Sequence, residues 1–477
     1  MEPIVTPSEM AAIDAAAPEP VEELIERAGA EVAREALDLL GGAYGKRVVV
    51  LAGKGNNGAD GRAAARRLGS RGVRCRVIDA GSAPSELPDA DLVIDAAYGT
   101  GFRGTYEAPA LAGSSPPVLA VDIPSGVDGT TGVASGRPLS AERTVTFAAW
   151  KPGLLLADGA RLAGRVRVAD IGLDVSRAAA HRVTDDDVRA WLPSRPRDAH
   201  KWRSAVWVIA GSEGMTGAAH LACGGAQRSG AGYVRLSVPG VEAAGAPVEV
   251  VEVPFDDPEW SLEVVEGEAR FGALAVGPGL GRASATGDEV RRLVAGCRSA
   301  VVVDGDALHA LGRDAGRSVG SRAAGAGPVI LTPHDGELEA LLGEPIGTDR
   351  FEAVRSLAAH TGAVVLAKGP TTIVAAPDGW VLACDAGDAR LATAGTGDVL
   401  TGIVASLVAQ GLPGLEAAAG AALLHARAGA LAWERGMVAS DLVDLLPAAL
   451  EAVVGGPLAT HHPRRRGHDD RGPDVPT

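Results

Sequence analysis

The chain has 477 residues, of which 46% are hydrophobic, and it carries a formal net charge of −15. This length predicts two or three domains. The acidic balance argues against nucleic acid as a partner, and the lack of any run of about 18 apolar residues argues against a membrane span.

The cysteines and the first residues of the chain indicate the cellular compartment of the protein. Cys75, Cys223, Cys297 and Cys384 are far apart in the chain and fit neither a disulfide framework nor a zinc site. The chain opens with MEPIVT, which has neither the basic segment nor the apolar core of a secretory signal. We therefore expect a cytoplasmic protein.

The first half of the chain predicts a parallel sheet. A helical pattern with one apolar face covers residues 21–39, and short apolar runs then alternate with helix-length segments. The predicted strands are 46–52, 73–79, 91–95, 118–122 and 144–147. Continuous runs of Val, Ile and Leu are typical of strands buried on both faces, so we expect a doubly wound, Rossmann-like α/β domain.

The loop after the first of these strands is rich in glycine. Residues 53–61 read GKGNNGADG, which contains the G-x-G-x-x-G pattern of dinucleotide-binding loops, and Asp79 ends the next strand where a ribose-binding acid would lie. Asn56, Asn57 and Asp60 crowd this turn with polar side chains, which is unusual for a plain dinucleotide clamp. A dinucleotide-binding loop and a more specialised site both stay open.

Two further strands end in aspartate. Asp95 is followed by GTGFRG, and Asp122 is followed by IPSG. Because the carboxyl ends of parallel strands meet at one crevice, Asn57, Asp95 and Ser125 offer hard oxygen ligands to a cation, and Asp122 suits a general base. Such aspartates also cap helices and turns. Three loops of this kind together favour a site.

The regular pattern breaks before the second half. Residues 181–203 are polar and rich in proline, and they predict a linker between a domain at 1–180 and a second domain at 204–455. The predicted strands of the second domain are 204–210, 232–238, 271–276, 300–304, 329–332, 363–367 and 372–376. The composition of 456–477 predicts a disordered tail.

A glycine loop before an apolar helix is the most informative stretch of the second half. It reads LATAGTGDVLTG from Leu391. Gly395 and Gly397 free the backbone so that consecutive N–H groups can point at an anion at the helix N-terminus. Asp398 at its mouth suits the removal of a proton from a hydroxyl. The loop alone fits phosphoryl transfer to an alcohol and a capped helix equally well.

Four other strand-end loops change that balance. They contain the glycine-rich segment 276–281, the pair Asp304 and Asp306, the lone His334 and the lone Lys368. Glycines allow the backbone to approach a ligand closely, and a lysine supplies a compact positive charge for phosphates. Together with the glycine loop, they predict a nucleotide-dependent phosphoryl-transfer site.

Both halves resemble the bifunctional NAD(P)H-hydrate repair family, over residues 5 to 455. GKGNNGADG, DAAYGTGFRG and AVDIPSGVDGTTG resemble the NAD(P)H-hydrate epimerases. VGPGLG, LTPHDGE, AKGPTT and AGTGDVLTG resemble the ADP-dependent NAD(P)H-hydrate dehydratases, which have a ribokinase-like α/β/α fold. The resemblance implies that the first half interconverts the R and S hydrates of NADH and NADPH. It implies that the second half phosphorylates the S hydrate with ADP and expels phosphate, giving NAD(P)H, AMP and phosphate.

The resemblance also implies roles for individual residues. Asn57, Asp95 and Ser125 are expected to hold K⁺, Mg²⁺ is expected beside the phosphates of ADP, and we expect Asp122 and Asp398 to be the catalytic acid/base groups. The expected hydrate contacts are Asn56, Asn57, Gly58, Ala59, Asp60, Gly99, Thr100, Gly101, Phe102, Arg103, Gly104, Thr105, Ala218, Gly279 and His334. The expected nucleotide contacts are Lys368, Gly369, Pro370, Thr371, Thr372, Gly395, Thr396 and Gly397.

Two positions depart from the pattern of the family. Ala59 stands where a glycine is usual, which is tolerable unless the backbone needs a positive φ. Asp388-Ala-Arg390 replaces Asn-Pro-Gly, which leaves a nucleotide contact open. The alternatives are an NAD-dependent oxidoreductase, a sugar or pyrimidine-alcohol kinase with a fused dinucleotide-binding domain, and a first half that binds without catalysing. A homo-oligomer is compatible with the resemblance.

Overall fold

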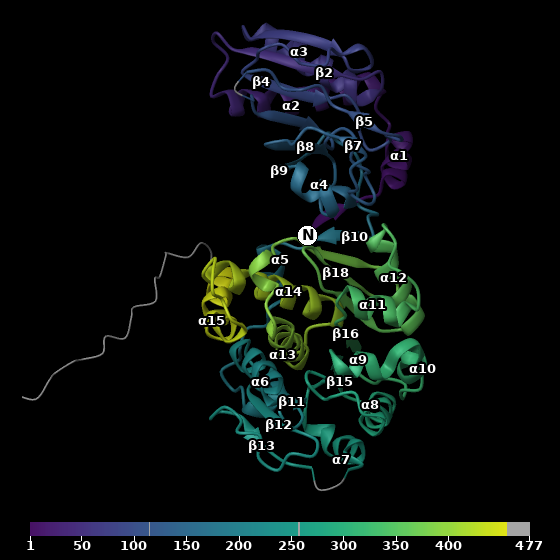
Figure 1. Cartoon of the computed structure of the whole chain (residues 1–477), viewed down its shortest axis with the longest axis vertical. Helices are drawn as coiled ribbons and strands as arrows, with labels where there is room; N and C mark the ends of the chain where they lie inside the picture. Colours follow the sequence, from purple (N-terminus) through teal and green to yellow (C-terminus); the bar gives the residue numbers. More distant parts are fainter. Residues whose placement is uncertain (114, 256–257, 456–477) are drawn as a thin grey trace, which may run out of the picture.

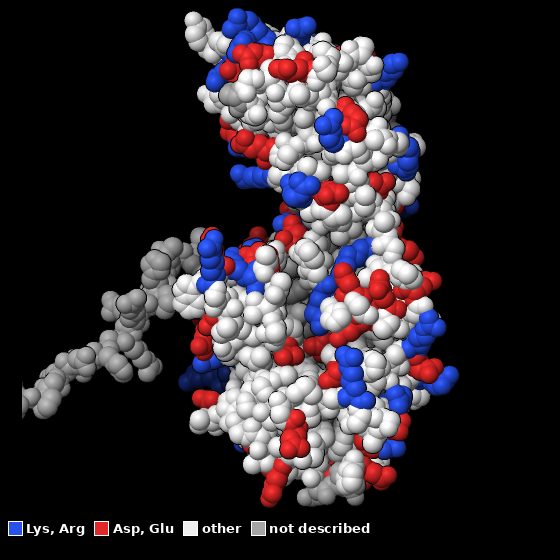
Figure 2. Space-filling view, in the orientation of Figure 1, with Lys and Arg blue, Asp and Glu red and all other residues white. Residues whose placement is uncertain are grey.

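The computed structural model describes residues 1–113, 115–255 and 258–455, and it shows two bodies joined at a narrow waist (Figure 1). The first N-terminal residues lie at this waist. Lys, Arg, Asp and Glu side chains are interspersed over the face of both bodies in Figure 2. Among the described residues, no helix has the length and apolar character needed to cross a bilayer.

The N-terminal body is built on a six-stranded sheet in which every pairing is parallel. The strand order is β3 (Arg74–Asp79), β2 (Arg47–Ala52), β4 (Leu92–Ala96), β6 (Val118–Val121), β8 (Arg143–Phe147) and β9 (Arg165–Ala169). The first five match the strands expected from the sequence within a few residues, and β9 was not among them. The Rossmann-like fold class is confirmed.

Helices and short elements complete this body. Helices α2 (Val21–Leu40) and α3 (Asn56–Ser70) pack together on one face of the sheet, where Val32 and Leu68 are fully buried. The remaining elements are α1 (Pro7–Ala16), α4 (Ala157–Leu162), the 3₁₀ turns η1 (Ala80–Ser82) and η2 (Pro152–Leu154), and the strand pair β5 (Tyr106–Glu107) and β7 (Gly136–Arg137).

The C-terminal body is built on an eleven-stranded sheet. Its strand order is β1 (Glu2–Ile4), β10 (Ala180–Arg182), β19 (Val381–Cys384), β18 (Thr372–Ala375), β17 (Val364–Ala367), β16 (Val329–Leu331), β15 (Ala300–Val303), β14 (Ala273–Val276), β11 (Ala205–Ile209), β12 (Tyr233–Ser237) and β13 (Val251–Glu252). The run from β17 to β13 is parallel, so the carboxyl ends of its strands share one edge.

Helices cover both faces of this sheet, because successive strand residues point to opposite sides. Val206 and Val208 pack under one layer, which consists of α6 (Thr216–Arg228), α13 (Thr396–Ala409), α14 (Gly414–Leu431) and α15 (Ala439–Gly455). Trp207 and Ile209 pack under the other layer, which consists of α7 (Trp260–Gly267), α8 (Ser284–Gly296), α9 (Asp306–Leu311), α10 (Ala315–Gly320), α11 (Asp335–Leu342) and α12 (Arg350–Thr361). This is the expected α/β/α arrangement.

The waist differs from the expected linker. Residues 181–203 contribute to β10, form α5 (Asp185–Trp191) and begin the 3₁₀ turn η3 (Lys201–Ser204). Val183 and Val188 are buried in the core of the C-terminal body, which explains why this segment is ordered against it rather than extended between the domains. The tail expected at 456–477 lies outside the described residues.

Strand β1 joins the two bodies through its backbone. It pairs antiparallel with β10 in the C-terminal sheet. On the other side, the N–H of Trp150 donates to the carbonyl of Pro3 at 2.9 Å, and the N–H of Val5 donates to the carbonyl of Trp150 at 2.9 Å. The first five residues therefore belong to both bodies at once.

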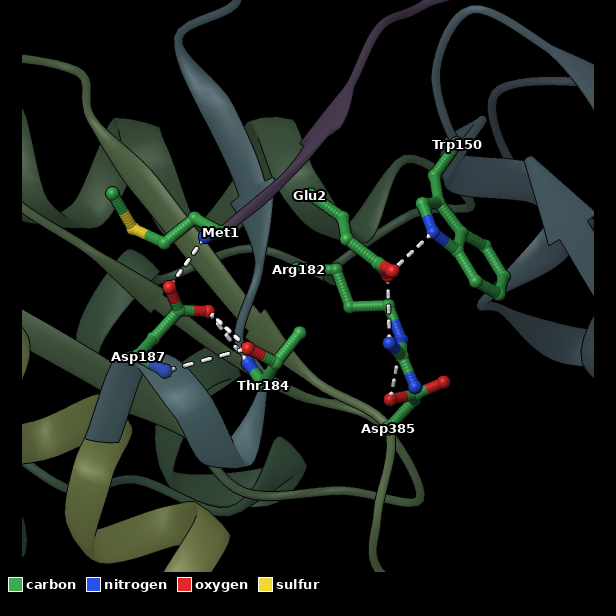
Figure 3. Close-up of polar contacts among 7 residues, drawn as sticks. All are labelled: Met1, Glu2, Trp150, Arg182, Thr184, Asp187 and Asp385. Carbon is green, nitrogen blue, oxygen red and sulfur yellow. Dashed lines mark hydrogen bonds and ion pairs between the residues drawn. The ribbon is translucent and has the colours of Figure 1, made fainter. Parts of the chain in front are cut away.

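A polar network and an apolar core reinforce this junction. Figure 3 shows Glu2 accepting hydrogen bonds from the indole of Trp150 at 2.9 Å and from Arg182 at 2.7 Å, while Arg182 also pairs with Asp385 at 2.9 Å. The amino group of Met1 pairs with Asp187 in the same view. One continuous apolar cluster contains Ile123, Trp150, Leu154 and Leu155 from the N-terminal body and Ile373, Val381 and Ala383 from the C-terminal sheet.

Candidate active sites

A cavity of about 650 Å³ opens at the carboxyl ends of β2, β4, β6 and β8. Seven of the expected hydrate contacts line it, and these are Asn56, Asn57, Asp60, Gly99, Thr100, Gly101 and Phe102. The expected catalytic residue Asp122 lines it too. Met10 and Asp14 of α1 complete its wall together with Lys54 and Lys151. The strand ends thus bring together the loops that sequence patterns singled out.

The other expected contacts in this half lie beside the cavity. Gly58 packs on the preceding loop, where an added Cβ would lie 2.0 Å from the carbonyl oxygen of Gly53, so only glycine fits there. Ala59 lies in the first turn of α3 with ordinary helical backbone, so its methyl group causes no strain. Three more residues lie in an exposed part of the loop that follows β4, and these are Arg103, Gly104 and Thr105.

Asp122 is held in a strained conformation by a buried lysine. Its φ is +66°, a region that residues with side chains rarely adopt. One carboxylate oxygen lies 2.7 Å from the Nζ of Lys151 and accepts a hydrogen bond from the hydroxyl of Thr146 at 3.1 Å. Lys151 is 1% exposed and also donates to Thr146 at 2.7 Å and to the carbonyl of Phe147 at 3.0 Å.

Two more carboxyl groups face the same space. Asp60 is 7% exposed, and burial, with the charges of Asp122 and Asp14 beside it, raises its pKa to about 8. Burial also raises the pKa of Asp14, against the opposing effect of Lys151. Asp60, with a pKa of about 8, therefore holds its proton at neutral pH.

The expected cation ligands form a second buried cluster beside the cavity. Asp95 is buried and accepts hydrogen bonds from the hydroxyl and the N–H of Ser125 at 2.7 and 2.9 Å. Burial raises the pKa of Asp95, and these hydrogen bonds counter that effect. Both polar atoms of the Asn57 amide are buried without a protein partner. Because buried polar atoms are normally satisfied, the amide oxygen of Asn57 is available to a ligand that supplies its missing partner.

The C-terminal site is centred on the start of α13. Gly395 caps this helix with a φ of +90°, and Asp398 lies in its first turn. The Nζ of Lys368 lies 2.8 Å from Asp304, whose other oxygen accepts a hydrogen bond from Thr401 at 2.7 Å. Asp304 is 2% exposed, so the lysine and the carboxylate hold each other in place where the helix N-terminus would attract an anion.

Charges in this cluster set the protonation states. Burial, with the nearby charge of Asp304, raises the pKa of Asp398 to about 7. Burial disfavours the charged form of Lys368, but Asp304 and Glu337 outweigh it, so the pKa of Lys368 is raised and the group stays an ammonium. Asp398 is therefore poised to gain or lose a proton near neutral pH, beside a fixed positive charge.

Other expected residues surround this centre. His334 caps α11, where its Nδ1 accepts from the N–H of Glu337 at 3.3 Å, and Glu337 lies 3.9 Å from Lys368. Gly279 and Ala218 are neighbours, since a Cβ added at Gly279 would lie 3.1 Å from that of Ala218. Thr396 donates its hydroxyl to the carbonyls of Leu391 and Thr393, and so fixes the turn of the glycine loop.

Some of the expected residues make contacts within the protein, and two residues of the sites had no assigned role. Thr371 is 6% exposed and donates its hydroxyl to the carbonyl of Leu155 at 2.6 Å, so that hydroxyl is engaged at the waist. Residues 388–390 start the 3₁₀ turn η6 (Ala389–Leu391), with Arg390 paired to Asp388. Lys151 and Asp304 had no assigned role, although both follow strand ends and Lys151 is one of only five lysines.

The two folds and the two strand-end sites define a protein with a Rossmann-like domain and a ribokinase-like domain. Residues 206–450 match the family described as NAD(P)H-hydrate dehydratase, and residues 21–90 and 78–153 match the family described as YjeF-related protein N-terminus. The bifunctional NAD(P)H-hydrate repair enzyme Nnr of Moorella thermoacetica is 37% identical over 94% of this chain and 96% of its own length. The Salinibacter ruber enzyme of the same name is 37% identical over 89% of this chain and 91% of its own length. The chain belongs to the family of bifunctional NAD(P)H-hydrate repair enzymes.

Solved structures agree for the C-terminal body. The ADP/ATP-dependent NAD(P)H-hydrate dehydratase from Bacillus subtilis, co-crystallised with ATP and Mg²⁺, is 31% identical, with a TM-score of 0.50 over 57% of this chain and 97% of its own. A ribokinase-like superfamily protein from Enterococcus faecalis is 22% identical, with a TM-score of 0.51 over 59% of this chain and 98% of its own. The second likeness concerns the fold, which is the predicted ribokinase-like one.

Proposed function

We propose that this chain repairs hydrated NADH and NADPH at two active sites. The N-terminal site interconverts the R and S hydrates. The C-terminal site converts the S hydrate and ADP into NAD(P)H, AMP and phosphate. The observation that carries the proposal is the arrangement of Asp398, Lys368 and the glycine-capped N-terminus of α13, in a chain whose first half carries a separate polar cavity.

The C-terminal residues suit phosphorylation of a hydroxyl. Asp398 accepts the hydroxyl proton while the hydroxyl oxygen bonds to the terminal phosphorus of ADP and the P–O bond to AMP breaks. Lys368 and the N–H groups of the helix start stabilise the charge on the phosphoryl oxygens. The C–O bond to phosphate then breaks, and a proton leaves the adjacent ring carbon, which restores the double bond. Phosphate is a far better leaving group than hydroxide.

The groups that would hold a metal ion differ between the two halves of the chain. Asn57, Asp95 and Ser125 are proposed to hold K⁺, which would fix the loops around the hydrate, and the unpartnered Asn57 amide fits this role. Among the described residues, no group of three or more His, Cys, Asp and Glu side chains suits a metal. The C-terminal site therefore fits Mg²⁺ that is held mainly by nucleotide phosphates, as is usual for this ion.

The kinase alternative predicts a stable phosphorylated product. The family membership favours dehydration instead, because the relatives over nearly the whole chain are named as repair enzymes and not as kinases. The four free cysteines suit a reducing compartment, which supports the predicted cytoplasmic location. A homo-oligomer stays a prediction.

A single assay separates these possibilities. ADP and the full chain are added to a mixed R and S preparation of NADH hydrate, and the return of dihydropyridine absorbance is followed with AMP and phosphate release. Full recovery requires both activities. Recovery that stops at the S fraction contradicts the epimerase, and a phosphorylated product that accumulates without absorbance supports the kinase. Replacing ADP by ATP, and NADH hydrate by NADPH hydrate, defines the preferred substrates.

A further inference from the structure

One buried cation in the N-terminal cavity has no role in either of the two proposed reactions. Of the five lysines, all within the described residues, only Lys151 is fully buried. It follows β8 and lines the cavity that Asp122 also lines. Burying an ammonium group costs free energy unless the group is paired, so contacts are needed that stabilise Lys151 in the cavity wall.

Lys151 fixes the carboxylate of Asp122. Lys151, Thr146 and Asp122 form a closed set of contacts of 2.7, 2.7 and 3.1 Å. The carbonyl of Phe147 accepts a further hydrogen bond from the ammonium at 3.0 Å. Together with the left-handed backbone of Asp122, these contacts fix the orientation of the Asp122 carboxylate relative to the cavity.

Asp60 is the chemical counterpart of Asp122. It comes from the first turns of α3 and lines the same cavity, yet it has no cation within hydrogen-bonding distance among the described residues. Its burial, with the charges of Asp122 and Asp14, favours the neutral acid up to a pH of about 8. Asp60, which keeps its proton, therefore shares one cavity with Asp122, whose carboxylate is oriented by Lys151, and this arrangement suits an acid paired with a base.

We propose that Asp60 is the general acid of the epimerisation and that Lys151 is the positioning residue that holds Asp122 as the opposing carboxylate. This inference rests on the proposed epimerase function. It assigns distinct roles to Asp60, which the family resemblance implied to be a substrate contact, and to Lys151, which had no assigned role.

The chemistry follows from the hydrate itself. Water adds to an enamine so that the hydroxyl joins the carbon bonded to nitrogen. To invert that carbon, its C–O bond breaks, the bonding pair leaves with oxygen, and the proton of Asp60 transfers to it to form water. The nitrogen lone pair forms a C=N bond, and the carboxylate of Asp122 faces the resulting cation. Water then adds to either face, the C=N pair returns to nitrogen, and the released proton goes to Asp60, or to Asp122 followed by exchange through solvent.

Several charged groups surround Asp60 and bear on its titration. Asp14 faces it from α1, Asp122 from the loop after β6, and Lys151 from the loop after β8. Arg62 on α3 and Asp79 at the end of β3 lie half-exposed, 3.9 Å apart from each other. Burial, reinforced by the charges of Asp122 and Asp14, keeps the proton on Asp60, while Lys151 is engaged by Asp122.

The test of Asp60 compares Asp60→Asn with the wild type in the full chain. We expect the wild-type epimerisation rate to fall as pH rises above about 8. The variant should lose about 100-fold or more and lack this limb of the profile, while Asp60→Glu recovers part of the rate. In H₂¹⁸O, each inversion should add one solvent oxygen to the hydrate. Asp174→Asn, on an exposed loop of the same body, is the matched control.

The test of Lys151 compares Lys151→Met with Lys151→Arg. We expect Lys151→Met to lower kcat for epimerisation about 10- to 100-fold with KM within about threefold, because the carboxylate of Asp122 loses the contact that orients it. Lys151→Arg should stay within about tenfold of the wild type. Lys46→Met, at the opposite end of β2, controls for loss of a lysine.

Dehydration of purified S hydrate shows that each protein is folded. It also separates a failure of the proposed epimerase function from a failure of the inference about Asp60 and Lys151. A wild-type protein that dehydrates the S hydrate but never inverts the R hydrate overturns the proposed epimerase function. A wild-type epimerase whose Asp60→Asn and Lys151→Met variants keep its rate and pH profile overturns only this inference. Inversion without uptake of ¹⁸O also overturns it, because ring opening at nitrogen would then be the route.

Discussion

The hydroxyl of Thr371 donates a 2.6 Å hydrogen bond to the carbonyl of Leu155, across the waist between the two bodies. Thr371 lies three residues after Lys368, which pairs with Asp304 in the C-terminal site. Leu155 lies four residues after Lys151, which pairs with Asp122 in the N-terminal site. One short connection therefore runs from a charged pair in one site to a charged pair in the other.

The Thr371–Leu155 contact gives a prediction for stability. Thr371→Val leaves the buried carbonyl of Leu155 without its donor, which costs about 1–3 kcal/mol. We expect a lower Tm for the full chain and weaker ADP binding, because the loop that carries Lys368 loses an anchor. Differential scanning calorimetry and titration calorimetry measure the two effects. Thr348→Val, at an exposed position, serves as control, and an unchanged Tm for Thr371→Val would contradict the contact.

Asp398 predicts the pH dependence of dehydration. A base must be ionised, and burial with the charge of Asp304 raises its pKa to about 7. The rate on S hydrate should therefore rise with pH through about 7 and level off above it. Asp398→Asn should lower kcat by about 100-fold or more, with ADP still bound. Asp378→Asn, in an exposed turn, should behave as the wild type. A flat profile between pH 5.5 and 8.5 would exclude this role for Asp398.

The orphaned amide of Asn57 predicts dependence of the epimerase on K⁺. In buffers whose only cation is the bulky tetramethylammonium ion, epimerisation should fall at least about tenfold, and added KCl should restore it, since the cavity oxygens need a cation of suitable size. Asn57→Ala should raise the KCl concentration needed for half-maximal activity. Dehydration of S hydrate by the Asn57→Ala protein is the internal control. Equal rates in both buffers would refute the prediction.

Asp60 predicts that folded-state stability depends on pH. Its pKa is about 8 when folded and 3.8 when unperturbed, so between these values the folded chain binds more protons than the unfolded chain. Stability is therefore lost as pH rises through this window. Asp60→Asn removes the titration, so its stability relative to the wild type should rise by up to about 1.4 kcal/mol per pH unit and level off above pH 8. Thermal unfolding at a series of pH values measures this, and a pH-independent difference would contradict it.

Much of the fold follows from local patterns. The continuous apolar runs such as Val48–Ala52 are strands because both faces are covered, and GKGNNGADG starts α3 because its glycines permit the close approach of Gly58 to Gly53. The five strands expected in the first half and the seven expected in the second half each correspond to a strand of the structure. These elements are determined by residues that lie close together in the sequence, so local patterns are enough to predict them.

The contacts that the sequence did not reveal are those made over long separations. The three-residue strand β1 is too short for any periodicity, and its partner β10 lies inside the expected linker. Thr371 resembles a phosphate ligand in its motif, but its hydroxyl is directed to Leu155 of the other body. The link from Lys151 to Asp122 depends on a β-crossover, so spacing alone could not pair them.

Strand β1 also determines an order of events during synthesis. Its residues leave the ribosome long before their partners, since Glu2 pairs with Arg182, 180 residues later, and β10 in turn pairs with Val381–Cys384. Contacts of such separation form late, because the intervening chain must first be confined. The N-terminal sheet can thus fold while its leading segment waits, and the edge of the C-terminal sheet closes only when nearly the whole chain has been made. The residues of β1 are therefore translated before the N-terminal sheet but reach their final place after it.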